Sequence, residues 1–464
     1  MKIFNEDTIV AIATPCGEGG IGIVRLSGKK SMAIADKIFF SKTKTKPSLF
    51  KSHTMHHGYI RNPQTKKISD EVMLAVMRAP LSYTKEDTIE INCHSGEAAL
   101  KNIVNLLLKY GARLAEPGEF TKRAFLNGRL DLTQAEAVLD IIKAKTEREL
   151  EASLVQLRGK LSIEIKNIKR EIFDVYSHIE AMLDFSDQNI AVMAKKEIQT
   201  KCAKALNSLK KLSSTFQEGK VIKNGMKCVI YGKPNVGKST LMNAFLKEER
   251  AIVTEFAGTT RDIISEQVII GGIVINLFDT AGIKKPDNII EEKSINKTNE
   301  ICENADIVLF MLDNNKKIIK KDLILFSKIK CRNIILIINK IDLPQKIDLR
   351  LIKQVFKNQA IVLVSAKKEK NINNLIEKIK NIAFKNFPKN SDKNLIVTNM
   401  RHKILIDESI NYLDNGFNNF KKDSALDLVA ADFKKSLDCL SEILGEAFTD
   451  ELLDNIFSNF CIGK

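Results

Sequence analysis

The stretch Gly232-Lys233-Pro234-Asn235-Val236-Gly237-Lys238-Ser239 decides the fold of a large part of this chain. It matches G-x-x-x-x-G-K-[ST], the phosphate-binding P-loop, and lies between an apolar run at 227–231 and a helix-compatible stretch at 240–247. The motif requires this order of strand, glycine-rich turn and helix, because backbone N–H groups and the helix N-terminus surround the phosphates. We expect Lys238 to contact the terminal phosphates and the Ser239 hydroxyl to bind Mg²⁺.

Three further motifs follow, each behind its own strand-like run. Asp279-Thr280-Ala281-Gly282 fits the D-x-x-G turn, which joins the Mg²⁺ shell and meets the γ-phosphate. Asn339-Lys340-Ile341-Asp342 fits N-K-x-D, whose Asp accepts hydrogen bonds from two donor groups on one edge of guanine. Ser365-Ala366-Lys367 would complete the base pocket. The four motifs predict a guanine-nucleotide domain with GTP contacts at Asn235, Val236, Gly237, Lys238, Ser239, Thr240, Asp279, Thr280, Ala281, Gly282, Asn339, Lys340, Asp342, Ser365, Ala366 and Lys367.

The residues after D-x-x-G raise the question of how water is oriented for hydrolysis. Many GTPases place a Gln there, whereas Ile283 and Lys284 follow Gly282 here. Either hydrolysis depends on a partner, or a K⁺ ion bound by Asn235 neutralises the developing charge. The first switch would contribute Thr260 to Mg²⁺ and backbone carbonyls of 254–259 to the K⁺ shell. The expected K⁺ ligands are Asn235, Thr254, Phe256 and Thr259, and the expected switch contacts to GTP are Thr254, Glu255, Phe256, Ala257, Gly258, Thr259 and Thr260.

Composition limits the class of protein. The 464 residues suffice for two or three domains, and a hydrophobic content of 44% supports well-filled cores. The apolar runs have strand length and the N-terminus lacks a signal-peptide pattern, so we expect a cytoplasmic protein without membrane contact. The net charge of +16 fits either an RNA partner or a Lys-, Ile- and Asn-rich genome. The eight cysteines form no C-x-x-C pair, so neither a zinc site nor a disulfide framework is indicated.

The P-loop region predicts an α/β domain at 223–385. Its strands are expected at 227–231, 264–270, 273–278, 306–312, 334–338 and 361–364. Gly271-Gly272 indicates a hairpin and therefore one antiparallel edge strand. The other strands alternate with helical stretches, which predicts a mostly parallel sheet covered by helices on both faces.

The regions on either side of the GTPase domain are helical in pattern. Apolar residues recur at helical spacing within 121–222 (Leu150, Leu154, Leu157, Leu161, Ile165, Ile168) and within 386–464 (Leu426, Val429, Phe433, Leu437, Leu440, Leu444). We expect both segments to form one discontinuous all-α domain into which the GTPase domain is inserted. Residues 1–120 predict an N-terminal α+β domain with strands near 8–13, 21–26, 71–77 and 88–92 and a helix near 98–110. Its G-x-G-x-x-G at 17–22 precedes a strand, which excludes a dinucleotide-binding turn.

Several longer motifs carry a resemblance to a known family. They are DTIVA at 7–11, GGIGIVR at 19–25, EPGEFTKRAFLNG at 116–128, LDL at 130–132, the P-loop with its Asn235, AGTTRD at 257–262 and CIGK at 461–464. On these residues the chain resembles the bacterial MnmE-type (TrmE) tRNA-modification GTPases over its full length. The resemblance implies a homodimer formed through the N-terminal folate-binding domains, and a K⁺-stimulated GTPase activated when the GTPase domains dimerise.

The resemblance also implies a reaction and its site. With a flavin-dependent partner, in a heterotetramer, such proteins add an aminomethyl or carboxymethylaminomethyl group to the five-position of wobble uridine in tRNA. The one-carbon unit comes from 5,10-methylenetetrahydrofolate, of which 5-formyltetrahydrofolate is a stable analogue. By similarity the folate pocket uses Arg25, Glu90, Arg129 and Lys464, although the family is expected to have Lys at position 129. The catalytic Glu of the second switch falls on Glu291, which with Asn235 and Lys238 makes up the catalytic set.

Alternatives remain open on the sequence alone. Cys461 is either a nucleophile that adds to the uridine ring or a packing residue that positions the C-terminus. The chain could instead be a ribosome-assembly GTPase that binds rRNA, although 386–464 contains no G-x-x-G loop of the kind used by single-stranded-RNA modules. It could also be a folate-dependent one-carbon transferase that its GTPase domain regulates.

Overall fold

The computed structural model describes residues 7–15, 17–184, 195–248, 265–279, 302–384, 395–422 and 424–464. Contacts divide the chain into two compact units. The first comprises Met1–Ile142, Gln156–Leu206 and Glu408–Lys464. The second comprises Lys143–Val155 and Asn207–Asp407. The fold class predicted from the sequence is confirmed: an α+β N-terminal region, an all-α region built from two chain segments, and an inserted α/β P-loop region.

The N-terminal region is a seven-stranded sheet of order β3-β4-β5-β6-β2-β1-β7. Its strands are β1 (Ile9–Ile12), β2 (Gly22–Ser27), β3 (Phe39–Phe40), β4 (Thr54–Arg61), β5 (Ile68–Met77), β6 (Thr88–Cys93) and β7 (Arg113–Leu114). Helices α1 (Ser31–Ile38) and α2 (Glu97–Lys109) share one hydrophobic core with this sheet, and a short 3₁₀ turn spans Pro47–Leu49. The four predicted strands and the predicted helix are confirmed. Because β2 begins at Gly22, the G-x-G-x-x-G at 17–22 leads into a strand, as predicted.

Alternation along β2 and β6 separates core residues from site residues. Val24 and Leu26 point into the core with Ile89 and Ile91, so Arg25 lies on the opposite face of the sheet. The two strands are antiparallel, and their register pairs Arg25 with Glu90. Because β2 and β6 are adjacent central strands, this register places the Arg25–Glu90 pair in the middle of the sheet, on the face opposite the core.

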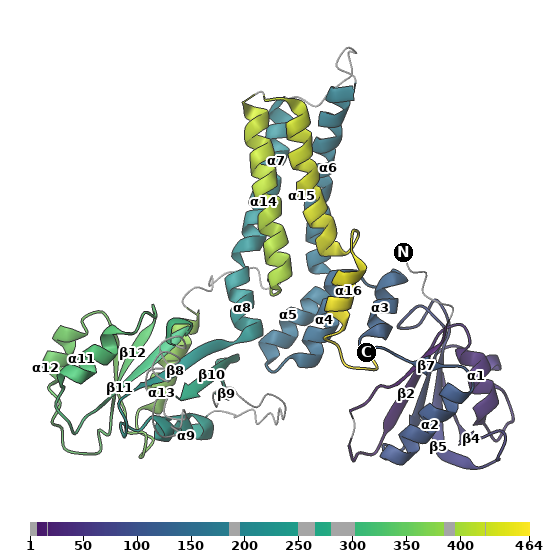
Figure 1. The fold of residues 1–464 in the computed structure, drawn as a ribbon, viewed down its shortest axis with the longest axis horizontal. Helices are drawn as coiled ribbons and strands as arrows, with labels where there is room; N and C mark the ends of the chain where they lie inside the picture. The colour runs from purple at the N-terminus through teal and green to yellow at the C-terminus, as the bar shows by residue number, and fades with distance from the viewer. Residues whose placement is uncertain are drawn as a thin grey trace, which may run out of the picture. The chain divides into compact units, whose positions relative to one another are not determined.

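Nine of the described helices belong neither to the N-terminal region nor to the P-loop region, and together they are called the all-α region. They are α3 (Glu119–Leu126), α4 (Leu132–Lys143), α5 (Glu147–Leu157), α6 (Lys160–Asp184), α7 (Lys195–Ser214), α8 (Phe216–Asn224), α14 (Met400–Lys421), α15 (Leu426–Leu444) and α16 (Asp450–Phe457). Helices α6 and α15 pack together, so the two predicted helical segments do meet (Figure 1). The stripe from Val429 to Leu444 is buried along α15, as predicted. The earlier stripe is split between α5 and α6, because the chain turns at Gly159, where φ is +77°.

The second unit contains a six-stranded sheet of order β13-β12-β11-β8-β10-β9 (Figure 1). Its strands are β8 (Met226–Gly232), β9 (Ser265–Ile270), β10 (Ile273–Asp279), β11 (Ile307–Asp313), β12 (Ile334–Asn339) and β13 (Ala360–Leu363). All pairs are parallel except β9 with β10, which turn back on each other at Gly271-Gly272. The predicted hairpin, the antiparallel edge strand and the parallel remainder are confirmed.

Helices cover both faces of this sheet. Helices α9 (Lys238–Glu248) and α13 (Ile372–Phe384) contribute to the core on one face. Helix α12 (Leu349–Val355) and residues beside α11 (Lys320–Ser327) contribute to the core on the other. Such a doubly covered sheet places the carboxyl ends of its parallel strands at one edge, where ligands bind. Among the described helices, none is both long and apolar enough to cross a bilayer.

Candidate functional site

The P-loop joins the end of β8 to the start of α9, as the motif requires. Gly237 has φ of +100°, a backbone conformation that favours glycine. A Cβ at this position would lie 2.3 Å from Asn339 Nδ2, so no side chain fits here. Lys238 is buried, and its Nζ donates to the carbonyls of Gly232 and Lys233 at 3.0 Å each. The P-loop therefore surrounds the Lys238 ammonium group, which the sequence predicts to contact the phosphates.

One amide side chain connects three of the nucleotide motifs. Asn339 closes β12, and its Nδ2 donates to the Val236 carbonyl of the P-loop at 2.8 Å. Its Oδ1 accepts from the Ala366 backbone N–H at 3.0 Å. The next residue, Lys340, donates from Nζ to the Asn235 carbonyl at 2.8 Å and to Asp313 at 2.7 Å. Hydrogen bonds within the protein thus connect three motifs that are separate in sequence. These bonds do not depend on a bound nucleotide.

The expected guanine-binding carboxylate is held by a neighbour. Ser365 Oγ donates to Asp342 Oδ1 at 2.5 Å. This hydrogen bond, with smaller contributions from Lys367 and Lys368, holds the pKa of Asp342 below its ordinary value. Asp342 is therefore an ionised acceptor at neutral pH, which suits the two donor groups on the edge of guanine.

Some predicted nucleotide contacts lie beside the P-loop and some lie outside the described residues. Ser239 and Thr240 occupy the first turn of α9. Asp279 closes β10 in register with Ile230 of β8, so the D-x-x-G turn begins at the same edge as the P-loop. The expected residues outside the described part are Thr254, Glu255, Phe256, Ala257, Gly258, Thr259, Thr260, Thr280, Ala281, Gly282 and Glu291.

A second group of predicted residues meets on the N-terminal sheet. Arg25 donates from Nε to Glu90 Oε1 at 2.8 Å, and its Nη2 lies 2.8 Å from the same oxygen. The side chains are 16% and 23% exposed, so the pair is largely withdrawn from water. A third nitrogen, Nη1, donates to the Gly463 carbonyl at 3.2 Å. Residues at opposite ends of the chain are therefore joined at one guanidinium.

The C-terminal tail is fixed by backbone packing. Gly463 has φ of +95°, and a Cβ there would lie 2.4 Å from the Ile12 carbonyl oxygen. The Cys461 carbonyl accepts from the Gly118 N–H at 3.5 Å. Cys461 itself is exposed and Lys464 is half-buried. The tail thus brings the carbonyl of Gly463, the residue before Lys464, into contact with Arg25.

Arg129 is placed by Tyr83, a residue that the sequence did not single out. The guanidinium of Arg129 lies over the Tyr83 ring at 4.6 Å, and its Nη1 donates to the Tyr83 carbonyl at 3.2 Å. Arg25 lies over the same ring at 5.8 Å. Burial raises the pKa of Tyr83, although a hydrogen bond to Thr121 opposes that shift. Tyr83 stands in a turn-rich stretch without a motif, so no sequence pattern pointed to it.

An ion-pair network attaches α3 to the N-terminal sheet. Arg123 and Glu119 are each 2% exposed and pair at 2.9 Å. Arg123 also pairs with Asp7 at 2.7 Å and with Glu86 at 3.1 Å, and Arg113 pairs with Glu119 at 2.6 Å. Burial raises the pKa of Glu119, but the hydrogen bonds from Arg113, the Glu116 N–H and Arg123 outweigh it and the pKa is lowered. The sequence showed Asp7, Glu119 and Arg123 within family motifs, but it singled out neither Glu86 nor Arg113 and did not reveal the pairing.

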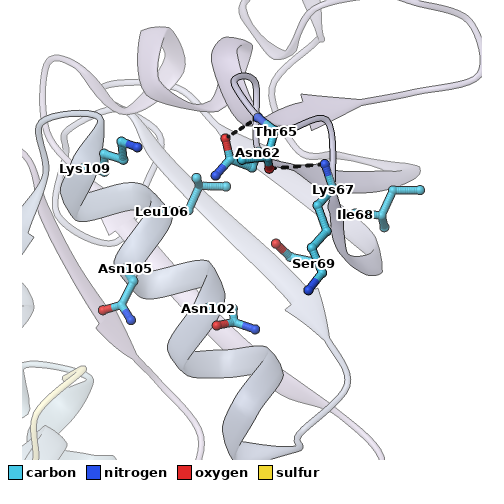
Figure 2. A pocket seen from close by; sticks show the side chains of 9 residues that line it. All are labelled: Asn62, Thr65, Lys67, Ile68, Ser69, Asn102, Asn105, Leu106 and Lys109. Carbon is cyan, nitrogen blue, oxygen red and sulfur yellow. Dashed lines mark hydrogen bonds between the residues drawn. The ribbon is translucent and has the colours of Figure 1, made fainter.

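A polar hollow on the same unit lies apart from the predicted residues. It has a volume of about 380 Å³ between the β4–β5 turn and α2 (Figure 2). Its lining residues are Asn62, Thr65, Lys67, Ile68, Ser69, Asn102, Asn105, Leu106 and Lys109. Since none of the residues predicted to bind a ligand lines it, the hollow adds nothing to the two sites above.

Comparison with known proteins supports both regions. The family profile of the MnmE helical domain matches residues 132–461, and that of the GTP-binding protein TrmE N-terminus matches residues 8–129. A tRNA modification GTPase MnmE from Alkaliphilus oremlandii is 42% identical over 100% of both chains. Relatives with the same name from Bacillus licheniformis (40% identical; 99% of this chain, 100% of the relative) and Thermoanaerobacter pseudethanolicus (43% identical; 99% of each) also match.

Among solved structures, Era of Aquifex aeolicus is 28% identical and covers 40% of this chain and 67% of its own. Its TM-score of 0.28 is too low to support an argument. The relatives at 40% identity or more cover 99–100% of the chain. The chain therefore belongs to the MnmE family of tRNA modification GTPases.

Proposed function

We propose that this chain hydrolyses GTP in the cytoplasm to drive the modification of the wobble uridine of tRNA. With a flavin-dependent partner it adds an aminomethyl or carboxymethylaminomethyl group at the five-position, using the one-carbon unit of 5,10-methylenetetrahydrofolate. The observation that carries the proposal is that one chain holds both a P-loop joined to a guanine-type pocket and an Arg25–Glu90 pair contacted by its own C-terminus.

The P-loop and the base-pocket residues bind the nucleotide. Lys238 binds the terminal phosphates, Asp342 binds guanine, and Asn339 keeps the loop and the base pocket in register. A Mg²⁺ ion held by Ser239 and Thr260 would neutralise charge on the phosphates. The hydroxyl of Ser239, on the first turn of α9, fits an oxygen-seeking cation.

Hydrolysis itself is assigned to Glu291 and Asn235. Asn235 is exposed with φ of +63°, and its carbonyl is held by Lys340. Its amide oxygen, with Thr254, Phe256 and Thr259, would hold a K⁺ ion that neutralises developing charge. Glu291 would orient the attacking water. Equal GTPase rates in K⁺ and Na⁺ would contradict the K⁺ assignment, and an unchanged rate in Glu291→Ala would contradict the role of Glu291.

The N-terminal residues fit a reduced folate. Glu90 offers carboxylate oxygens suited to the donor-rich edge of a pterin, and Arg129 and Lys464 offer cations suited to the anionic glutamyl tail. The bound folate would supply the one-carbon unit, while the hydrogen bond from Arg25 would keep Glu90 oriented. Cys461 acts in this proposal as a positioning residue, because its carbonyl contacts Gly118 and fixes the tail.

The proposal assigns one task to each part of the chain. Residues 1–120 bind folate and form the homodimer, 121–222 and 386–464 form the helical domain, and 223–385 form the GTPase domain. The homodimer and the flavin-dependent partner together form a heterotetramer that acts on tRNA. GTPase-domain dimerisation, aided by K⁺, would then couple hydrolysis to the modification.

The test is the nucleoside content of tRNA. A strain that lacks this chain should lose the five-substituted wobble uridine, measured by mass spectrometry of digested tRNA. The unmodified chain should restore it, whereas Lys238→Ala and Arg25→Ala should each fail to do so. Full modification in the deletion strain would refute the proposal, and nucleotide-dependent co-sedimentation with ribosomal subunits in that case would favour an rRNA-binding GTPase.

A further inference from the structure

The loop that carries Tyr83 is joined to the end of α3 by a series of hydrogen bonds. Asn127 Nδ2 donates to the Thr84 carbonyl at 2.7 Å, and Lys85 Nζ donates to the Gly128 carbonyl at 2.9 Å. Arg129 donates to the Tyr83 carbonyl, and the Tyr83 hydroxyl bonds to Thr121 Oγ1 at 2.9 Å. Hydrogen bonds thus hold two loops that are far apart in sequence together, and Arg129 takes part in them.

The two guanidinium groups of this site differ in exposure. The Arg25 side chain is 16% exposed and is paired with Glu90, whereas Arg129 is exposed. Arg129 is nevertheless not free to swing, since its guanidinium lies over the Tyr83 ring and also donates to the backbone of that residue. A planar guanidinium can stack on an aromatic ring and still present an edge to a carboxylate, which a Lys ammonium cannot do.

The two ends of the site therefore differ in charge. The inner end holds a carboxylate, Glu90, whose charge is balanced by Arg25. The outer end holds the stacked guanidinium of Arg129. A reduced folate has the matching polarity, with hydrogen-bond donors on its pterin and carboxylates on its glutamyl tail.

We infer that Tyr83 is a positioning residue that holds Arg129 in place to bind a carboxylate of the folate's glutamyl tail, with the pterin directed towards Glu90. This inference rests on the proposed folate site and gives the bound molecule a direction.

The experiment compares two probes on the full-length chain by isothermal titration calorimetry. One probe is 5-formyltetrahydrofolate, and the other is its dimethyl ester, in which both tail carboxylates are neutral. The unmodified chain should bind the acid about tenfold more tightly than the ester, the contribution expected of a charge-assisted hydrogen-bond pair. Arg129→Gln should remove most of that preference, and Lys464, the other cation assigned to the glutamyl tail, should account for the remainder.

Tyr83→Leu should weaken binding of the acid by about two- to fivefold, the range of an exposed cation–π contact, and should leave the ester's affinity unchanged. Tyr83→Phe keeps the ring and should retain nearly full preference for the acid. Tyr110→Leu is the matched control, since Lys37 lies over that ring at 5.5 Å elsewhere in the same domain. It should change neither affinity.

The outcomes separate this inference from the folate proposal. If Tyr83→Leu weakens the acid and the ester equally, Tyr83 only packs the site and the inference is overturned. Loss of preference in Tyr83→Phe would also overturn it, because the ring alone would then not suffice. If the unmodified chain binds neither probe, the folate proposal itself fails. If Arg25→Ala abolishes both affinities while Tyr83→Leu keeps the full acid preference, the folate site stands and only the tail assignment falls.

Discussion

The two candidate sites of this chain are built in opposite ways. The nucleotide site is made of contiguous motifs: a glycine-rich turn follows β8, and three motifs follow the ends of other strands of the same sheet. The N-terminal site is made of single residues from four separate segments, which contribute the side chains of Arg25, Glu90 and Arg129 and the carbonyl of Gly463. A site of contiguous motifs needs several adjacent residues of fixed type, whereas a site of single residues needs only tertiary contacts that bring them together.

This difference has consequences for what each site tolerates. The P-loop is fixed locally by glycine conformation and by Asn339. The N-terminal site depends on an ion-pair network and on a tail whose contacts lie more than four hundred positions away along the chain. We therefore expect single changes to affect one site without the other, and the N-terminal site to be the more sensitive to acid and to changes remote in sequence.

The largest effect is expected at Lys238. Lys238→Ala should lower GTP affinity and hydrolysis by about a thousandfold or more, because the ammonium at the phosphates is lost in a largely dehydrated loop. Fluorescent-nucleotide binding and phosphate release measure this. The control is Lys247→Ala on the same helix, where the side chain is 71% exposed and pairs with Glu369. If Lys238→Ala still binds 5-formyltetrahydrofolate, the two sites are independent, as expected. If that binding is lost, the two sites are not independent.

Glu119 tests the ion-pair network. Glu119→Gln should reduce the stability of the N-terminal region by about 2 kcal/mol, because Arg123 and Arg113 lose one of the two carboxylates that they share, the other being Asp7. Calorimetry and hydrogen exchange of the α3 peptides measure this change. The surface control Glu97→Gln, which loses only the exposed pair with Lys101, should leave both readouts unchanged. Equal behaviour of the two variants would contradict the structural role of the network.

Low pH should destabilise the attachment of α3 by protonating the Glu119 carboxylate. The folded-state pKa of Glu119 lies below its ordinary value of 4.5, so its contribution is complete above that value and is lost as pH falls through the folded pKa. Hydrogen exchange at α3 should therefore rise below about pH 4.5 in the unmodified chain. In Glu119→Gln the rise should be smaller, because the titrating group is gone.

Arg25 tests the central pair of the N-terminal site. Arg25→Ala should weaken 5-formyltetrahydrofolate binding by about a hundredfold, because Glu90 is left without its partner and the Gly463 contact is lost. GTP hydrolysis should be unchanged. Arg61→Ala, whose guanidinium lies over Phe40 in the same domain, is the control and should bind folate normally. A parallel fall in GTP hydrolysis would show that the sites are not separable.

The smallest effect is expected from the tail. Gly463→Ala places a Cβ against the Ile12 carbonyl and disfavours the φ of +95°, so the tail should shift and folate affinity should fall by about tenfold. Gly96→Ala adds a Cβ that meets nothing within 4 Å and should have no effect. Normal folate binding in Gly463→Ala would show that the tail contact with Arg25 is dispensable.

What the sequence determined by itself follows local rules. The P-loop, the three later motifs, the Gly271-Gly272 hairpin and the α15 stripe were each visible because short-range periodicity and turn chemistry fix them. The parallel order of strands then followed from the alternation of strands and helices. The resemblance to the MnmE family came from contiguous motifs and is confirmed by relatives that match the whole chain.

Only the tertiary structure decided which distant residues meet. No spacing in the sequence indicates that Arg25 is hydrogen-bonded to Gly463, that Tyr83 lies under Arg129, or that Glu119 joins Arg113 to Arg123. The sequence also did not reveal that Gly159 would divide one apolar stripe between two helices. Such contacts depend on how the pleat of a sheet and the packing of its helices align segments that the chain keeps far apart, and that alignment is a property of the whole fold.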